Sequence, residues 1–228
     1  MKDFYNRTKM MGESLIAAGM MDEKVRDLLV TYGRNGYGKG MVFYGPPGGG
    51  KTTLLNWFLE DAYEPIVLED GKITSSMVVA QEYEELWAVR SGVTFINTRS
   101  DGKYPEKLLL LSELANKNIF IVDNPMNDGA ATIISMLSNA GCRTVVTIKS
   151  CSAADAFEEL ETRIWRGADD LVGAFNTITT NQATKRAAAF KTFVCIENHQ
   201  VTKIDEVIGY DEEKKAVLLK NVFQKEEK

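Results

Sequence analysis

The chain has little of what several protein classes require. It contains one histidine and three cysteines among 228 residues, and their separation in the sequence does not match the spacing of zinc ligands. No apolar run approaches the roughly 20 residues that span a bilayer. Basic residues (27) are fewer than acidic residues (32), so the formal charge is −5 and no overall positive field attracts nucleic acid. These absences argue against a zinc-stabilised fold, against a membrane-spanning helix and against binding to nucleic acid through an overall positive charge.

The N-terminal residues indicate the cellular compartment of the protein. Met1–Arg7 is charged and lacks the apolar centre of a signal peptide, so we expect a cytoplasmic protein. In that reducing compartment Cys142, Cys151 and Cys195 are expected to be free thiols. Hydrophobic residues make up 44% and charged residues 26% of the chain, which are ordinary values for a folded globular protein. Intrinsic disorder and a disulfide-stapled mini-protein are thereby excluded.

Hydrophobic periodicity predicts an α/β fold with a mostly parallel sheet. Short apolar runs typical of buried strands alternate with segments of helical spacing, the pattern of a sheet covered by helices on both faces. Strands are predicted at Met41–Tyr44, Pro65–Leu68, Val93–Asn97, Asn118–Asp123 and Arg143–Ile148. Helices are predicted at Gln81–Val89, Pro105–Asn116, Ala130–Asn139 and Ala153–Ile164, and after the glycine-rich turn to about Ala62.

The two ends of the chain differ from this alternating middle. Residues 1–40 are predicted to be a short helical lead-in, with two helices within Glu13–Gly33. Residues 41–190 form the predicted core. From residue 191 to 228 short apolar segments are separated by turn residues at Asn198-His199 and Asp211–Lys215, which predicts an antiparallel β-meander and a tail of the same domain.

The strongest motif is GPPGGGKT, at Gly45–Thr52, which matches GxxxxGK[ST] and lies between a predicted strand and a predicted helix. Its glycines let successive amide groups point toward an anion. In such a loop the lysine reaches the β and γ phosphates and the following hydroxyl binds Mg²⁺. The predicted nucleotide-binding residues are Gly45, Pro46, Pro47, Gly48, Gly49, Gly50, Lys51, Thr52 and Thr53, with Thr52 also a metal ligand.

A nucleotide site of this kind needs an acid at the end of a second strand, to hold Mg²⁺. Asp123 ends the apolar run NIFIVD and is our candidate for the metal side of the site. The alternative is a turn or helix-capping aspartate before Pro125. The next residue is Asn124, and because an amide cannot accept a proton from water, a different acid is needed as the base.

Glu69 and Asp70 close another predicted strand. Because the ends of parallel strands converge on the ligand crevice, Glu69 is placed near the γ-phosphate. The alternative, of similar weight from spacing alone, is a pair of solvated turn acids before Gly71.

With these residues in view, the chain resembles the type II and type IV secretion (traffic) ATPases, in particular their Tad-pilus and conjugation-type branch, over about Ser14–Phe223. The resemblance implies a P-loop NTPase motor with a RecA-like sheet, and a role for Glu69 in hydrolysis or Mg²⁺ handling. It is carried by LIAAG at 15–19, GPPGGGKTTLLN at 45–56, LED at 68–70, the segment 138–160 and the ending at 201–223.

The sequence departs from the family pattern at several positions. Lys149 stands where the family has histidine, and Asn124 where many hydrolytic relatives have glutamate, so the γ-phosphate sensor is either impaired or rebuilt and turnover is expected to be weak. Pro125-Met126-Asn127 replaces an arginine-containing segment. Family members also carry a substantial N-terminal domain, whereas Met1–Tyr44 alone precedes the loop in this sequence, as expected of either a minimal motor or one portion of a longer protein.

The resemblance also implies the partners. Relatives assemble as rings of six with ATP and Mg²⁺ between subunits, and act on an inner-membrane component, so a peripheral location at the inner face of the membrane is implied. Arginines supplied across the interface complete such sites. The available ones are Arg90, Arg99, Arg143 and Arg163, of which Arg90 and Arg99 are the preferred candidates.

Three functions follow, from different classes. The first is an ATPase motor built on Lys51, Glu69 and Asp123. The second is a nucleotide-binding regulatory or structural subunit with little hydrolysis, which Asn124 and Lys149 favour. The third is a nucleic-acid motor, against which the acidic composition counts.

Overall fold

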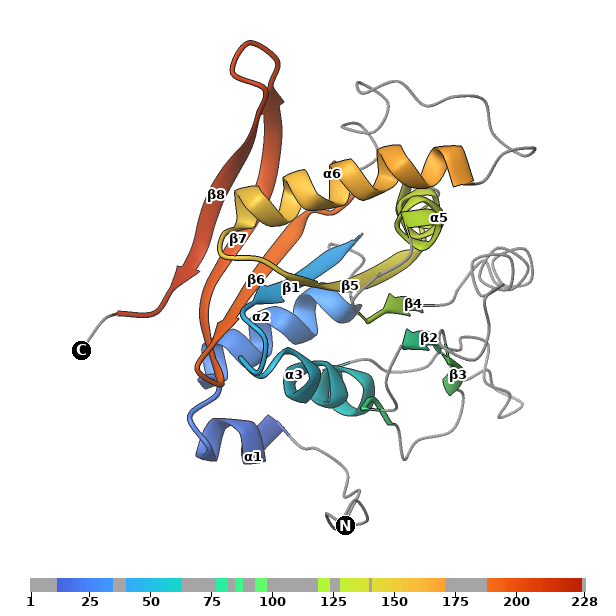
Figure 1. Cartoon of the computed structure of the whole chain (residues 1–228). Helices are drawn as coiled ribbons and strands as arrows, with labels where there is room; N and C mark the ends of the chain where they lie inside the picture. Colours follow the sequence, from blue (N-terminus) through green and yellow to red (C-terminus); the bar gives the residue numbers. More distant parts are fainter. Residues whose placement is uncertain are drawn as a thin grey trace.

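The computed structural model describes residues 12–34, 40–62, 77–81, 85–87, 93–97, 119–123, 128–139, 141–170 and 188–226. Within these residues one eight-stranded sheet forms the centre of the molecule, in the order β3-β2-β4-β5-β1-β6-β7-β8 (Figure 1). The first six strands in this order pair in parallel, and β7 and β8 continue the sheet antiparallel. The strands are β1 (Met41–Gly45), β2 (Met77–Gln81), β3 (Val93–Asn97), β4 (Ile119–Val122), β5 (Arg143–Lys149), β6 (Thr192–Glu197), β7 (Gln200–Asp211) and β8 (Ala216–Gln224).

Helices cover both faces of this sheet. The helices α5 (Asp128–Asn139) and α6 (Ala153–Asp170) lie on one face, and α1 (Gly12–Ala17), α2 (Glu23–Arg34) and α3 (Lys51–Trp57) lie on the other (Figure 1). Each face has its own apolar core, and successive residues of β5 alternate between them: Val146 and Ile148 pack with α5 and α6, and Val145 packs with α1–α3. No helix of the described residues is long and apolar enough to cross a membrane.

The central strands are buried on both faces, which is why they appear in the sequence as unbroken apolar runs. Every residue of β1, β2 and β4 is buried. Parallel strands covered by helices on both sides have no face left for polar residues. The strands predicted at 41–44, 93–97, 118–123 and 143–148 are confirmed to within one residue at each end.

The helix predicted at Gln81–Val89 is wrong where the structure describes it. Gln81 ends strand β2, which the sequence analysis did not predict, and 85–87 are not helical. The backbone amides there are bound by buried side chains instead of by a helical ladder: Leu86 N–H donates to Gln81 Oε1 (2.9 Å), and Trp87 N–H donates to Asn56 Oδ1 (3.0 Å). The predicted strand at 65–68 and helix at 105–116 lie outside the described residues.

The helix that follows the glycine-rich turn reaches Ala62, as predicted, but its last part is a π-helical turn, η1 (Phe58–Ala62). Asp61 on this turn accepts two hydrogen bonds at Oδ2, from the Trp57 indole N–H (2.9 Å) and from the backbone N–H of Gly12 at the start of α1 (3.0 Å). The π turn thus places the Asp61 carboxylate so that its hydrogen bonds connect the start of α1 with the end of α3.

Helix α6 begins at the predicted residue, Ala153, but runs to Asp170, beyond the predicted end at Ile164. Its start is capped, since Ser152 Oγ accepts a hydrogen bond from Asp155 N–H (3.0 Å). Helix α5 begins two residues before its predicted start.

Replacing Ser152 with alanine is expected to lower the free energy of unfolding by about 1 kcal/mol, because the amide of Asp155 loses its acceptor. Ser152→Asp supplies another capping oxygen and is expected to remain close to wild type. Urea unfolding of both variants measures the difference. Equal losses in the two variants would show that the cap contributes nothing.

Candidate functional site

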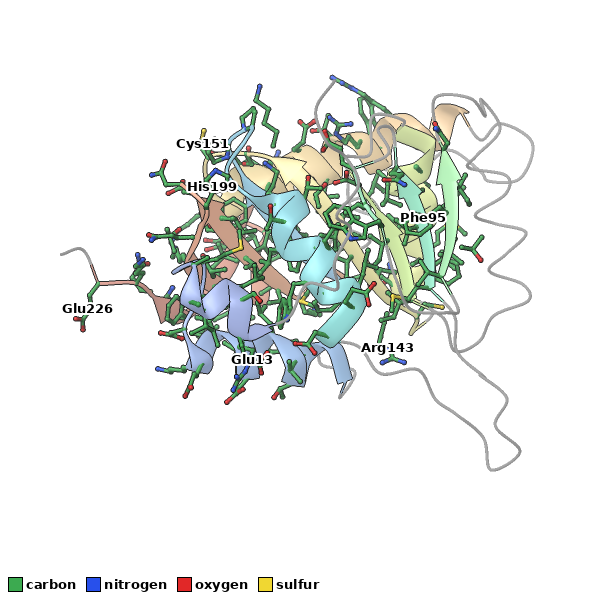
Figure 2. All side chains as sticks on the ribbon, turned by 90° about the horizontal axis from the view of Figure 1, so that it is seen from below. Glu13, Phe95, Arg143, Cys151, His199 and Glu226 are labelled. Carbon is green, nitrogen blue, oxygen red and sulfur yellow. The ribbon has the colours of Figure 1, made fainter. Side chains whose placement is uncertain are left out.

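The candidate site lies where the parallel strands end. Strand β1 runs directly into the glycine-rich loop, β5 ends at Lys149 beside it, and β4 ends just before Asp123. Figure 2 shows Cys151, which follows the end of β5, and His199, in the turn after β6, toward one side of the molecule. Arg143, at the start of β5, lies toward the opposite side (Figure 2). Ligands of open α/β sheets bind in the crevice at the carboxyl ends of the strands, which is this edge.

Glycine is required at Gly45, where β1 turns into the loop. Its φ is 146°, and a Cβ there would lie 2.0 Å from the backbone carbonyl oxygen of Ile196 on β6. Gly48 and Gly50 also have positive φ, of 72° and 106°, and Gly50 is the N-cap of α3. The loop therefore has a tightly packed base at Gly45 and an exposed tip at Pro46–Gly48.

The turn between β6 and β7 packs against the back of the loop. His199 N–H donates to the Gly49 carbonyl (2.9 Å), and a Cβ on Gly49 would lie 2.7 Å from the Ile196 carbonyl oxygen. Asn198 and His199 both have positive φ, of 50° and 59°, the backbone of a tight hairpin turn. The sequence analysis identified Asn198-His199 only as a turn. Its contact with the loop depends on pairing across the sheet, for which the sequence carries no local signal.

Lys51, the first residue of α3, directs its ammonium group back into the loop. Nζ donates to the carbonyl oxygens of Gly45 (2.8 Å) and Pro46 (2.7 Å). A lysine ammonium has three N–H donors, so one more can go to a ligand oxygen. Burial is the largest influence on the pKa of Lys51 and lowers it; the charge of Asp123 raises it, and that of Lys149 lowers it further.

Asp123 lies across β5 from the loop and is held in place. Its backbone N–H donates to the Ala80 carbonyl on β2 (2.9 Å), and its Oδ1 accepts a hydrogen bond from the Thr147 hydroxyl on β5 (2.5 Å). The side chain is half-buried and within electrostatic range of Lys51. The sequence analysis chose Asp123 but missed Thr147, whose polar position within a buried strand was the available signal.

The remaining predicted residues fall into three sets: two beside Lys51, two away from the loop, and others outside the described residues. Thr52 and Thr53 are half-buried at the start of α3, beside Lys51. Arg163 pairs with Glu159 on α6 (2.6 Å), and Arg143 donates to the Gly33 carbonyl (3.0 Å) at the edge of the sheet opposite the loop. The other predicted positions lie outside the described residues: Glu69, Asp70, Arg90, Arg99, Asn124 and 125–127.

The arrangement fits a phosphate-bearing ligand and a divalent cation. In loops of this sequence backbone amides surround the anion. Here the Lys51 ammonium lies in the loop, and Thr52 and Asp123 supply a hydroxyl and a carboxylate, the groups that hold Mg²⁺ in sites with this motif. Mg²⁺ is usually held by one or two protein oxygens, with water and ligand phosphates completing its shell.

Solved structures with the same fold were found. The ATPase DotB of Legionella pneumophila superposes with a TM-score of 0.53 at 11% identity, over 90% of this chain and 49% of that one. VirB11 from the Brucella suis type IV secretion system, in complex with sulphate, gives 0.53 at 10% identity, over 98% and 58%. The pilus retraction motor PilT with bound ADP gives 0.52 at 11% identity, over 87% and 49%.

No protein-family model and no curated protein matches the sequence significantly. The chain spans about half the length of these three solved structures. These neighbours confirm the predicted α/β class, a mostly parallel sheet with antiparallel C-terminal strands, and they do not single out the Tad branch. The chain therefore has the fold of the type II and type IV secretion ATPases, to which its sequence motifs also point.

Proposed function

We propose that the chain is a Mg²⁺-dependent, ATP-binding and ATP-hydrolysing motor subunit of a secretion, conjugation or type IV pilus-like assembly machine. The observation that carries this proposal is the glycine loop at the end of β1, with the Lys51 ammonium directed into it and Asp123 at the end of β4. The shared fold of DotB, VirB11 and PilT supports a motor of this class.

In this proposal the loop residues bind the phosphates. The backbone amides of the loop and the third N–H of Lys51 donate to phosphate oxygens, while Thr52 and Asp123 hold Mg²⁺. Asp123 is held by the Thr147 hydroxyl, which donates to its Oδ1, and by its own backbone N–H, which donates to the Ala80 carbonyl. In this proposal its carboxylate would face the metal ion. Glu69 is our candidate for the group that orients and deprotonates the attacking water, which displaces ADP from the terminal phosphorus.

The proposed assembly is a hexameric ring acting on an inner-membrane component, at the cytoplasmic face. The fold shared with secretion and pilus ATPases supports this proposal. Light scattering of the purified chain with and without MgATP measures the mass of the assembly, which for a hexameric ring is six times the mass of one chain.

The activity itself is tested by phosphate release from MgATP by the purified chain. We expect slow but measurable turnover that is lost when Mg²⁺ is chelated. Absence of turnover with retained ATP binding would favour the second candidate, a regulatory subunit, for which Asn124 is the specific observation. In that case Asn124→Glu, which supplies a carboxylate able to accept a proton, should raise turnover.

Asp123→Asn is expected to raise the Mg²⁺ concentration needed for half-maximal ATP binding by about tenfold, because an amide lacks the negative charge that attracts the cation. ATP binding titrated against Mg²⁺ measures the shift. Asp155→Asn, an exposed position in the first turn of α6, is the matched control and should leave the Mg²⁺ requirement unchanged. An unchanged requirement in Asp123→Asn would remove Asp123 from the metal site.

A further inference from the structure

A groove lies between helix α6 and the β7–β8 hairpin, away from the glycine loop. Helix α6 lies beside this hairpin (Figure 1). The groove has a volume of about 410 Å³, and the described residues that line it are Glu158, Glu161, Thr162, Trp165, Tyr210 and Lys215. Ligand pockets in proteins span about 300–1,000 Å³, so this groove is large enough for one long side chain.

Two aromatic side chains form the apolar part of the groove. Trp165 is 48% exposed, whereas the other two tryptophans of the chain, both also described, are buried or half-buried. Tyr210 is held in place because its ring stacks on Phe157 of α6, with ring centroids 6.2 Å apart and 29° between the planes. Tryptophan, tyrosine and arginine are the residues that most often dominate the energy of protein interfaces. An exposed Trp165 beside a fixed tyrosine is therefore a candidate binding surface.

The described charged residues around the groove are mostly acidic. Glu161 precedes Trp165 by about one helical turn and Glu158 by about two, so the three side chains share a face of α6. Glu158 is exposed, and no ion pair between described side chains involves it. Lys215 is the one basic residue among the described lining residues, and the exposed acids at 212–213 precede it in the hairpin turn. This balance of charge favours a cationic occupant.

We propose that the groove is a docking site for an arginine side chain on a basic segment of a partner protein. The guanidinium group is planar and stacks on aromatic rings, so it can lie on Trp165 with its N–H groups toward the carboxylates of α6. A lysine ammonium is attracted by the same charges but has no planar surface to stack. A second copy of this chain is a poorer match, because its net charge is −5 and like charges repel.

Binding of fluorescein-labelled peptides to the purified full chain, measured by fluorescence anisotropy, tests this proposal. The probes are a Gly/Ser peptide with three arginines and matched peptides with three lysines or three glutamates. We expect saturable binding of the arginine peptide, several-fold weaker binding of the lysine peptide and no binding of the glutamate peptide. Trp165→Ala is expected to weaken binding of the arginine peptide by about tenfold, and Glu158→Gln by about threefold.

Matched control variants remove the same groups elsewhere on the surface. Phe95→Ala removes another exposed aromatic ring, from β3 at the far edge of the sheet, and Glu23→Gln removes an exposed carboxylate from the first turn of α2. Both controls should bind the arginine peptide as wild type does. The thermal midpoint of each variant shows whether it is folded. If Trp165→Ala does not fold, Glu158→Gln carries the test, because Glu158 is exposed.

Losses confined to the Trp165 and Glu158 variants, with a preference for arginine over lysine, support the proposal. Equal affinity for the arginine and lysine peptides would show attraction by charge alone, and unchanged affinity in both variants would place the peptide outside the groove. Either result, or the absence of saturable binding to the wild-type chain, overturns the inference. Self-association of the chain in light scattering that Trp165→Ala abolishes would assign the groove to a second copy and would overturn it as well.

Discussion

Gly45→Ala is expected to lower the free energy of unfolding by about 4 kcal/mol, among the largest effects of any single substitution in this chain. The added Cβ would lie 2.0 Å from the Ile196 carbonyl oxygen, which belongs to the backbone of the neighbouring strand β6 and cannot rotate away. Forcing a carbon into such a packed site costs up to about 3 kcal/mol. The φ of 146° adds about 1 kcal/mol or more of backbone strain.

Gly141→Ala is the matched control for this prediction. Gly141 also has a positive φ, of 92°, but among the described residues other than its chain neighbours no atom lies within 4 Å of the position that its Cβ would take. Its expected cost is the backbone strain alone, about 1 kcal/mol. Urea unfolding of the two variants separates crowding from strain. Losses of equal size would contradict the close packing of the loop against β6.

Lys51→Ala is expected to weaken binding of MgATP by about a hundredfold and to abolish detectable hydrolysis. The variant removes an ammonium group that lies in the loop, where Nζ donates to the carbonyls of Gly45 and Pro46. A hydrogen bond to a charged group contributes about 1.5–3 kcal/mol, which corresponds to a factor of about ten to a hundred in affinity. The upper end applies because Lys51 is partly buried, which strengthens its interaction with an anion.

Competition against a fluorescent ATP analogue measures this loss. Lys214→Ala removes an equal charge from the exposed β7–β8 turn and should bind as wild type does. Because Lys51 also ties two carbonyls of its own loop, the thermal midpoint of the variant should be measured alongside. Unchanged ATP affinity in a folded Lys51→Ala chain would place the nucleotide, if it binds at all, outside the glycine loop.

The parts of the fold that the sequence predicted well are those in which local pattern and burial agree. β1 and β4 are apolar over their whole length because helices cover both faces of the sheet, so composition alone marked them as strands. The start of α6 was predicted at the correct residue. Its cap, Ser152, is a residue type that favours helix starts.

The secondary-structure predictions failed where side chains from other elements bind the backbone amides and so determine the backbone conformation. The helix was predicted from apolar residues spaced over 81–89, but the amides of Leu86 and Trp87 are bound by the side chains of Gln81 on β2 and Asn56 on α3. Both side chains are buried, so their own polar groups needed partners, and the nearby backbone provided them. The contact with Asn56 joins residues far apart in the sequence and cannot be read from a local window. The hydrogen bond between Gly12 and Asp61, on the π turn at the end of α3, likewise joins residues far apart in the sequence.

In the candidate site, too, the residues of a local motif were predicted and the residues placed by strand pairing were not. The loop and Lys51 were identified from contiguous residues, because the motif is local. Thr147 and His199 gained their roles from strand pairing: one binds Asp123 across β4 and β5, the other binds Gly49 from the β6–β7 turn. Lys149 was noticed in the sequence only as a departure from the family pattern. The register with Gly45 is what places it at the loop.

Calorimetric titration of the purified chain with MgATP measures whether the loop after β1 binds a nucleotide. We expect saturable binding of one nucleotide per chain, with a loss of heat when Mg²⁺ is chelated. No detectable heat with ATP or with GTP, in the presence of Mg²⁺ and a folded chain, would contradict it.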